Sequence, residues 1–185
     1  MQIHYWIERV ALFDDESAFK ELFLHYNGQL FNLAHSFVGS EQVAEEIISD
    51  SFMNLWRNRS RLIGIENLTV YLYVSVKNLS IRYLTRNKAK GHLVMDELLL
   101  ANIPTSTQTP DQLMVSKEVV KTIENAIEDL PPKCKLIFKL VREDGLKYKE
   151  IAQILNISVK TIDAQMAIAG KRIMQAIRFQ IPGKK

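Results

Sequence analysis

The sequence predicts an all-α protein in which two small helical domains are joined by a flexible linker. Apolar residues recur every three or four positions through most of the chain, which is the period of a helix packed on one side. This periodicity stops between Asn87 and Gln112, where the segment carries Gly91, Pro104, Pro110 and a run of serine and threonine. Such a segment is typical of a linker, with at most a short apolar element at 98–100.

The charged side chains fall into four blocks that also indicate two domains. The net charge is −7 over residues 1–56, +7 over 57–90, −5 over 91–130 and +8 over 131–185. Two basic blocks separated by an acidic spacer favour two contacts with nucleic acid. Solvated helix faces give a similar pattern, so the charge supports this interpretation without deciding it.

Composition excludes several other classes of protein. The 185 residues are 47% hydrophobic, enough for one large core or two small ones. Cys134 is the single cysteine, which rules out an internal disulfide and a cysteine zinc cluster. The N-terminus lacks a basic start followed by an apolar run, and no apolar stretch approaches the roughly 20 residues of a membrane span. We therefore expect a cytoplasmic protein with no direct insertion into a membrane.

Four helices are expected in the N-terminal half. The first covers about residues 1–12, and the second begins near the capping candidates at 14–17 and runs to Val38, where Gly39 ends it. Ser40 caps a third helix that runs to about Arg59. A polar, basic turn follows at 57–66, and Asn67 then caps a helix to about Arg86.

The helix at 40–59 has an apolar stripe and an acidic opposite side. Carboxylates on a helix raise the possibility of a di-metal site, but that site needs Glu-x-x-His. Ile48 and Ser49 stand where Glu45 and Glu46 would require histidine, so this possibility fails. A solvated acidic face and a protein-docking face remain equally compatible with the pattern.

The helix at 67–86 interleaves aromatic and basic residues on one face. Tyr71, Ser75, Asn78, Arg82 and Arg86 recur at helical spacing. Rings that stack on bases, beside cations that meet phosphates, suit single-stranded nucleic acid. The alternative is that the tyrosines only line the rim of the core.

The C-terminal half contains a predicted helix-turn-helix. A helix at 113–129 and another at 133–142 precede it, with Pro131 and Pro132 between them. A short helix then covers 148–155, Asn156 tolerates the left-handed backbone of a helix end, and Ser158 caps a second helix. This spacing is typical of a DNA-binding unit whose second helix enters the major groove.

The second helix of this unit has the residues that DNA recognition requires. Its apolar stripe should pack inward and comprises Ile162, Met166, Ala169, Ile173 and Ile177. The residues expected to reach base edges are Ser158, Val159, Lys160, Thr161, Ala164 and Gln165. Lys171, Arg172 and Arg178 follow and can meet phosphate. The alternative is a plain helical hairpin whose cations only keep it soluble.

Two stretches resemble the extracytoplasmic-function sigma factors of the sigma-70 family. The run AIEDLPPKCKLIFKLVREDGLKYKEIAQILNISVKTI (126–162) is similar to region 4 of that family in its LPP, GLKYKEIA and ISVKT motifs. Two residues depart from the pattern: Lys147 stands where a small hydroxyl residue is usual, and Gly170 where leucine is frequent. The stretch from Val43 to Arg86, with its acidic-apolar helix ending in LW and its later YLY, resembles region 2.

The resemblance implies a domain layout and roles for particular residues. Residues 1–90 would form the region 2 helical bundle, 91–112 a linker, and 113–185 region 4, a helix-turn-helix arranged like a winged helix without its wing. The positions implied to dock on core polymerase are Glu45, Asp50, Phe52, Leu55 and Trp56, although Phe52 and Leu55 also belong to the apolar stripe. The positions implied to hold the melted −10 strand are Arg61, Asn67, Tyr71, Lys77, Asn78 and Arg82. The −35 duplex would fall to Ser158, Val159, Lys160, Thr161, Ala164, Gln165, Lys171 and Arg172.

These expectations combine into one predicted function. The chain would be an alternative sigma factor that binds core RNA polymerase and promoter DNA and answers to an anti-sigma factor. We expect no enzyme activity, cofactor or metal, because the sequence has no Gly-rich phosphate loop, catalytic triad order or ligand cluster. The alternative is a stand-alone helix-turn-helix regulator, which would bind symmetric duplex sites. A helical enzyme or adaptor is the weakest of the three.

Overall fold

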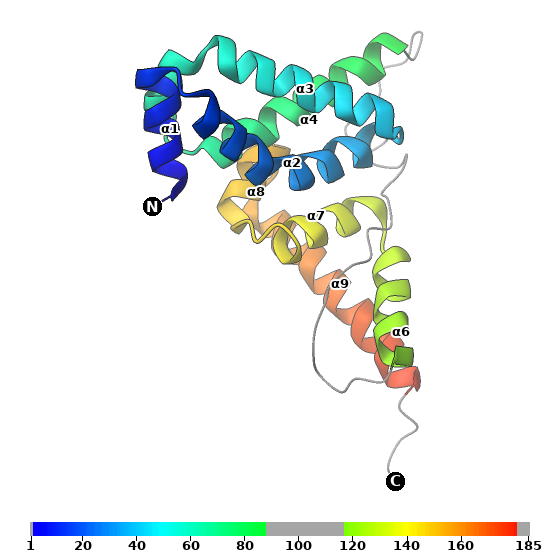
Figure 1. Ribbon diagram of the computed structural model, residues 1–185. Helices are drawn as coiled ribbons and strands as arrows, with labels where there is room; N and C mark the ends of the chain where they lie inside the picture. Colours follow the sequence, from blue (N-terminus) through cyan, green and yellow to red (C-terminus); the bar gives the residue numbers. More distant parts are fainter. Residues whose placement is uncertain (1, 88–116, 181–185) are drawn as a thin grey trace. The chain divides into compact units, whose positions relative to one another are not determined.

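The computed structural model describes residues 2–87 and 117–180, which are helical apart from short turns (Figure 1). They form two compact units, one within residues 1–102 and the other within 103–185. The predicted all-α fold with two helical domains is therefore confirmed. The expected linker at 91–112 and its short apolar element lie outside the described residues.

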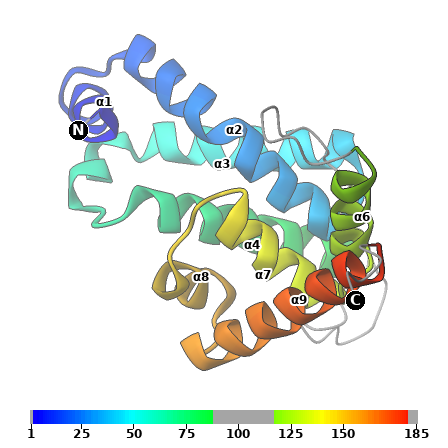
Figure 2. The same ribbon diagram turned by 90° about the horizontal axis from the view of Figure 1, so that it is seen from below.

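The N-terminal unit is a bundle of three long helices with a shorter one at its end. The elements are α1 (Gln2–Phe13), α2 (Glu16–Val38), α3 (Glu41–Arg57), a 3-10 helix η1 (Arg59–Gly64) and α4 (Leu68–Asn87). Helices α2, α3 and α4 pack on one another, and α1 packs on α2 and η1 (Figure 2). Tyr26, Phe37, Leu72 and Tyr73 are fully buried between them. Hydrogen bonds across the helices join α2 to α4: the hydroxyls of Tyr26 and Thr69 are bonded to each other, and the Tyr73 hydroxyl donates to Gln29 Oε1.

The helix ends follow the local sequence signals closely. Gly39 ends α2 with a left-handed φ of 68°, and its N–H donates to the His35 carbonyl. Ser40 Oγ accepts from the Val43 N–H, and Asn67 Oδ1 accepts from the Val70 N–H at 3.0 Å. These three predicted helix ends are confirmed.

The segment expected to be a polar turn is instead the 3-10 helix η1. Leu62 is buried at its centre and anchors it to the bundle. Arg59 fixes its start by donating to the Trp56 carbonyl at 3.1 Å. The basic composition of the segment concealed this single apolar anchor.

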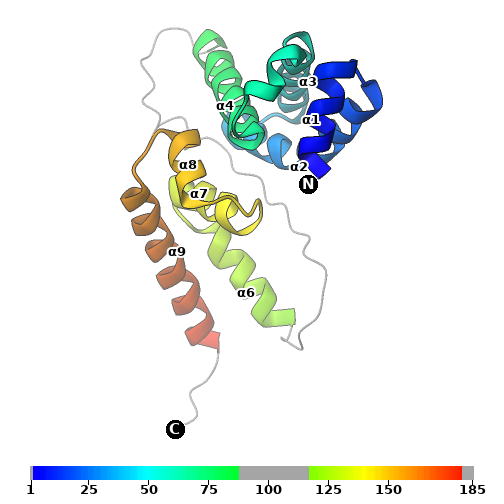
Figure 3. The ribbon, with the colours of Figure 1, turned by 90° about the vertical axis from the view of Figure 1, so that its left-hand side faces the viewer.

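The C-terminal unit is organised around its last helix. The elements are α6 (Lys117–Glu128), α7 (Pro132–Arg142), α8 (Tyr148–Leu155) and α9 (Val159–Gln180). Helix α9 contacts the other three, and it runs beside α6 (Figure 3). Ile137, Ile151, Ile154 and Ile162 are fully buried in this unit. Within residues 117–180 there is no strand, as expected for the arrangement without a wing.

The turn between α8 and α9 has the geometry that the sequence predicts. Asn156 adopts a left-handed φ of 54° and ends α8. The Ile157 N–H then donates to the Ala152 carbonyl, and Ser158 Oγ accepts from the Thr161 N–H at 3.0 Å to begin α9.

Lys147 begins α8 without a side-chain cap, because an ammonium group has no acceptor. The Glu150 carboxylate compensates by accepting from the Lys147 N–H at 2.8 Å. One of the two departures from the family pattern is therefore offset three residues later.

Gly28 offers a test of the bundle's packing. It lies inside α2, and a Cβ added there meets nothing within 4 Å. Replacing Gly28 with alanine should raise the free energy of unfolding by about 1 kcal/mol, because glycine is the more flexible residue when unfolded. Both tryptophans, Trp6 and Trp56, lie in this unit, so urea unfolding followed by tryptophan fluorescence measures its stability selectively.

Gly39→Ala is the matched control, since its left-handed backbone is strained for any residue with a Cβ. It should lower the free energy of unfolding. Equal effects at Gly28 and Gly39 would contradict the assigned backbone conformations.

Candidate nucleic-acid interface

Helix α9 has one fully exposed face along its length. Successive residues turn by about 100°, so residues three, four and seven apart share a side. The exposed residues on this outward face of α9 are Lys160, Asp163, Ala164, Ala167, Ile168, Gly170, Lys171, Met174, Gln175 and Arg178. Ile162 and Ala169, on the opposite side, are completely buried. The predicted inward stripe is thus confirmed at its two innermost positions.

The residues predicted to meet duplex DNA are not equally available on α9. Lys160, Ala164 and Lys171 lie on the outward face. The hydroxyls of Ser158 and Thr161 lie 2.8 Å apart and take part in the cap.

Two other predicted residues contact the rest of the C-terminal unit. Gln165 is half-buried, and its backbone carbonyl accepts from the Cys134 thiol at 3.2 Å. Arg172 is exposed but donates to the Asp129 carbonyl at 3.1 Å. Arg172 therefore also ties α9 to the end of α6, in addition to any contact with phosphate.

Sequence reasoning missed several exposed residues of this unit. Asp163 and Ala167 are exposed on the outward face, whereas Gln165 is half-buried. Lys147 and Lys149 are exposed at the start of α8. The first helix of such a motif crosses the DNA backbone, so their position at the start of that helix could have indicated phosphate contact.

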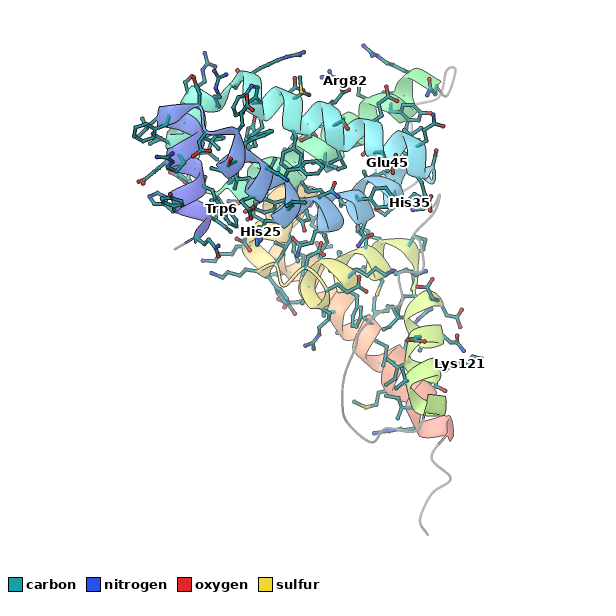
Figure 4. All side chains as sticks on the ribbon, viewed as in Figure 1. Trp6, His25, His35, Glu45, Arg82 and Lys121 are labelled. Atoms are coloured by element: carbon teal, nitrogen blue, oxygen red, sulfur yellow. The ribbon has the colours of Figure 1, made fainter. Side chains whose placement is uncertain are left out.

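The outer side of α4 carries most of the predicted single-strand residues. Tyr71 is 39% exposed, and Asn78, Arg82 and Arg86 are exposed on the same side. Arg82 extends away from the bundle (Figure 4). Ser75 is half-buried, and its hydroxyl is bonded to Ser51 of α3 at 3.2 Å. Arg61 is exposed on η1.

Lys77, which the resemblance implies to hold the melted strand, lies apart from this exposed row. Its side chain is only 7% exposed, and burial lowers the pKa of the Lys77 ammonium group. The sequence pattern already placed it off the row, two positions from Ser75 and one from Asn78. Asn67 differs in another way, because its side-chain oxygen caps α4.

The predicted docking residues of α3 separate into surface and core. Glu45 and Asp50 are exposed, whereas Phe52 and Leu55 are 3% and 1% exposed. Phe52 packs edge-on against Phe19 and Phe23 of α2. Phe52 and Leu55 could serve in docking or in the core, and their burial in this structure shows that they belong to the core.

Trp56 is half-buried and is contacted by Phe19 and Arg59. The Phe19 ring centroid lies 4.9 Å from that of the indole, and the Arg59 guanidinium lies 4.7 Å from its centre. Asp14 pairs with Arg59 from the loop before α2, where it adopts a left-handed φ of 52°. The pair links the α1–α2 loop to the start of η1, and Asp14 thereby holds the Arg59 guanidinium that lies over the Trp56 ring.

Other kinds of site find no support in the described parts of the chain. No group of three or more potential metal ligands occurs among residues 2–87 and 117–180. The His25 ring lies 5.9 Å from that of Trp6 at a tilt of 59°, and the His35 ring stacks on Phe31 (Figure 4). No described helix combines the length and apolar character that a bilayer crossing needs.

Known proteins resemble this chain over both units. The family model "Sigma-70 region 2" matches residues 22–90, and "Sigma-70, region 4" matches residues 121–173. The chain is 25% identical to the ECF RNA polymerase sigma factor SigW of Bacillus subtilis, with 90% of each chain covered. It is 26% identical to the ECF RNA polymerase sigma-E factor of Haemophilus influenzae, with 93% of each covered. The fold is similar to CnrH, solved with the cytosolic domain of CnrY, at a TM-score of 0.58 and 15% identity over 97% of this chain and 99% of that one.

Two sigma regions in this order, each on its own helical unit, define a transcription initiation factor. The chain belongs to the sigma-70 family. Within that family it is an extracytoplasmic-function sigma factor, that is, an alternative sigma factor directing RNA polymerase to its promoters.

We expect the N-terminal unit to lose stability in acid because of Asp14 and Asp15, the two carboxylates that precede α2. Hydrogen bonding to Arg59 lowers the pKa of Asp14, and the Ala18 N–H and then Arg9 lower the pKa of Asp15. A lowered pKa means that the carboxylate favours the folded state above its unfolded pKa of about 4 and that this contribution disappears as the pH falls through the folded value. Stability should therefore decrease below about pH 4.

The measurement is urea unfolding by tryptophan fluorescence between pH 6 and pH 3. The double variant Asp14→Asn, Asp15→Asn should be less stable than the parent at pH 6 and should show a shallower loss with acid. Glu21→Gln, an exposed change on α2, is the control and should follow the parent. An unchanged pH dependence in the double variant would show that these two carboxylates do not couple to folding.

Proposed function

We propose that the two units of this sigma factor divide promoter recognition between them. The C-terminal unit binds the −35 duplex through the outward face of α9, with Lys160 at its centre. The N-terminal unit holds the melted −10 strand along α4, through Tyr71, Asn78 and Arg82, assisted by Arg61. The observation that carries this proposal is the exposure of both rows on helices whose opposite sides are buried.

The docking surface for core polymerase is proposed on α3 and the end of the bundle. Glu45 and Asp50 supply exposed carboxylates, and Trp56 supplies an aromatic edge held in place by Arg59. Phe52 and Leu55 act indirectly, because their burial fixes the outer side of α3. The protein works in the cytoplasm as a binding factor and not as an enzyme.

A protein inhibitor of the anti-sigma class is also proposed as a partner. One structure of similar fold is the sigma factor RpoE with the anti-sigma factor NepR from Bartonella quintana, at a TM-score of 0.56 and 18% identity over 88% of this chain and 98% of that one. That likeness concerns the fold, and the proposal for this chain rests on its family. The stand-alone regulator is not favoured, because it leaves the region 2 match unexplained.

Lys160 tests the −35 assignment. Replacing it with alanine should reduce run-off transcription from −35-dependent promoters about tenfold, because it removes the cation at the centre of the outward face. Binding to purified core RNA polymerase should be unchanged in a pull-down. Lys121→Ala, an exposed lysine on α6, is the matched control and should retain both activities (Figure 4).

Two results would contradict the proposal. An equal loss of polymerase binding in the Lys160 variant would show that the units do not divide these tasks. No polymerase binding by the parent chain, together with tight binding to a free palindromic duplex, would instead favour the stand-alone regulator.

Tyr71 and Arg82 test strand capture. The double variant Tyr71→Ala, Arg82→Ala should form the closed complex normally but reach the open complex poorly, because only the melted strand exposes bases for stacking. Permanganate footprinting measures the melted bases, and gel shift at low temperature measures the closed complex. Tyr5→Ala, another exposed tyrosine of this unit, should leave both stages unchanged. Equal loss at both stages would reject the role of α4.

A further inference from the structure

The N-terminal part of the outward face of α9 has an unusual charge content for a surface that meets DNA. Between Ser158 and Gly170 the sequence holds one cation, Lys160, and one anion, Asp163. Both side chains are exposed on the same side of the helix. The two charges cancel, so this part of the helix gains no net attraction to phosphate.

Asp163 has no evident role in folding. Ser158 already caps α9, and Asp163 is the fifth residue of the helix, beyond the first turn where a carboxylate stabilises the helix dipole. Within residues 2–87 and 117–180, its carboxylate has no hydrogen-bond or ion-pair partner. Lys160 lies three residues before it, but lysine preceding an acid is the weaker order for a helical pair.

The Asp163 carboxylate is unfavourable when α9 binds DNA. A negative charge near the phosphates weakens binding to every sequence, because binding depends on neutralising the backbone. A carboxylate in the first two turns of a recognition helix reaches base edges. It only accepts hydrogen bonds, and in the major groove cytosine presents the N4 amino donor, whereas guanine presents the acceptors N7 and O6.

We infer that Asp163 is a specificity-determining residue that selects a C·G pair in the −35 element by accepting a hydrogen bond from cytosine N4. This inference rests on the proposed −35 role of α9. Lys160, a donor on the same face, suits a neighbouring guanine, and the methyl groups of Ala164 and Ala167 suit thymine. This N-terminal part of the face therefore derives its selectivity from base contacts, whereas attraction to phosphate falls to Lys171 and Arg178 further along the same face.

The experiment uses holoenzyme, reconstituted from core RNA polymerase and the full chain, on a promoter library randomised across the −35 element. The parent chain should enrich one C·G pair. Asp163→Ala should reduce the preference for that C·G pair over the other base pairs about tenfold, at that position alone. The overall binding of this holoenzyme to promoter DNA should stay the same or increase. Asp163→Asn should transfer the preference to A·T, because an amide pairs with adenine N6 and N7.

The controls separate this inference from the proposed function. Glu124→Ala removes one negative charge from α6 and should leave the preferred sequence unchanged. A −35 preference that survives unaltered in both Asp163 variants overturns the inference and leaves the role of α9 standing. A parent chain with no −35 preference, and no effect of Lys160→Ala, overturns both.

Discussion

The burial of one stripe of α9 is the constraint on which the C-terminal unit depends. Ile162 and Ala169 are fully enclosed by the preceding helices, so the helix cannot rotate without exposing them. Their placement decides which residues face outward, and the Ser158 cap decides where that face begins. The set of residues on this surface is thus a consequence of packing on the opposite side. A substitution in the core that rotated α9 would change which residues face outward, although it replaced none of them.

The same principle applies to the N-terminal unit with a different result. Helix α4 buries Leu72, Tyr73 and Val76 and leaves Tyr71, Asn78 and Arg82 exposed. Helix α3 buries Phe52 and Leu55 and leaves its carboxylates outside. One bundle therefore exposes a basic, aromatic row on α4 and carboxylates on α3, and both helices pack on the same apolar core.

Periodicity and capping residues were sufficient to predict the described α-helices, because each depends on neighbours close in sequence, but not the 3-10 helix η1. Gly39, Ser40, Asn67, Asn156 and Ser158 all mark helix ends where expected. The exposure of individual residues was harder to predict. Lys77 lies in the core despite its charge, and Leu62 anchors a segment that is otherwise polar. The position of Asp163 on the exposed face follows from helical spacing, because it stands three residues after Lys160.

The single thiol has a consequence for following this protein in solution. Cys134 is completely buried, burial raises the pKa of its thiol, and Sγ donates to the Gln165 carbonyl of α9. Alkylating reagents require an accessible thiolate, so they should react only when α7 and α9 separate. Labelling kinetics at this one atom would then report how often the recognition helix detaches from its support, with no engineered probe and no competing site.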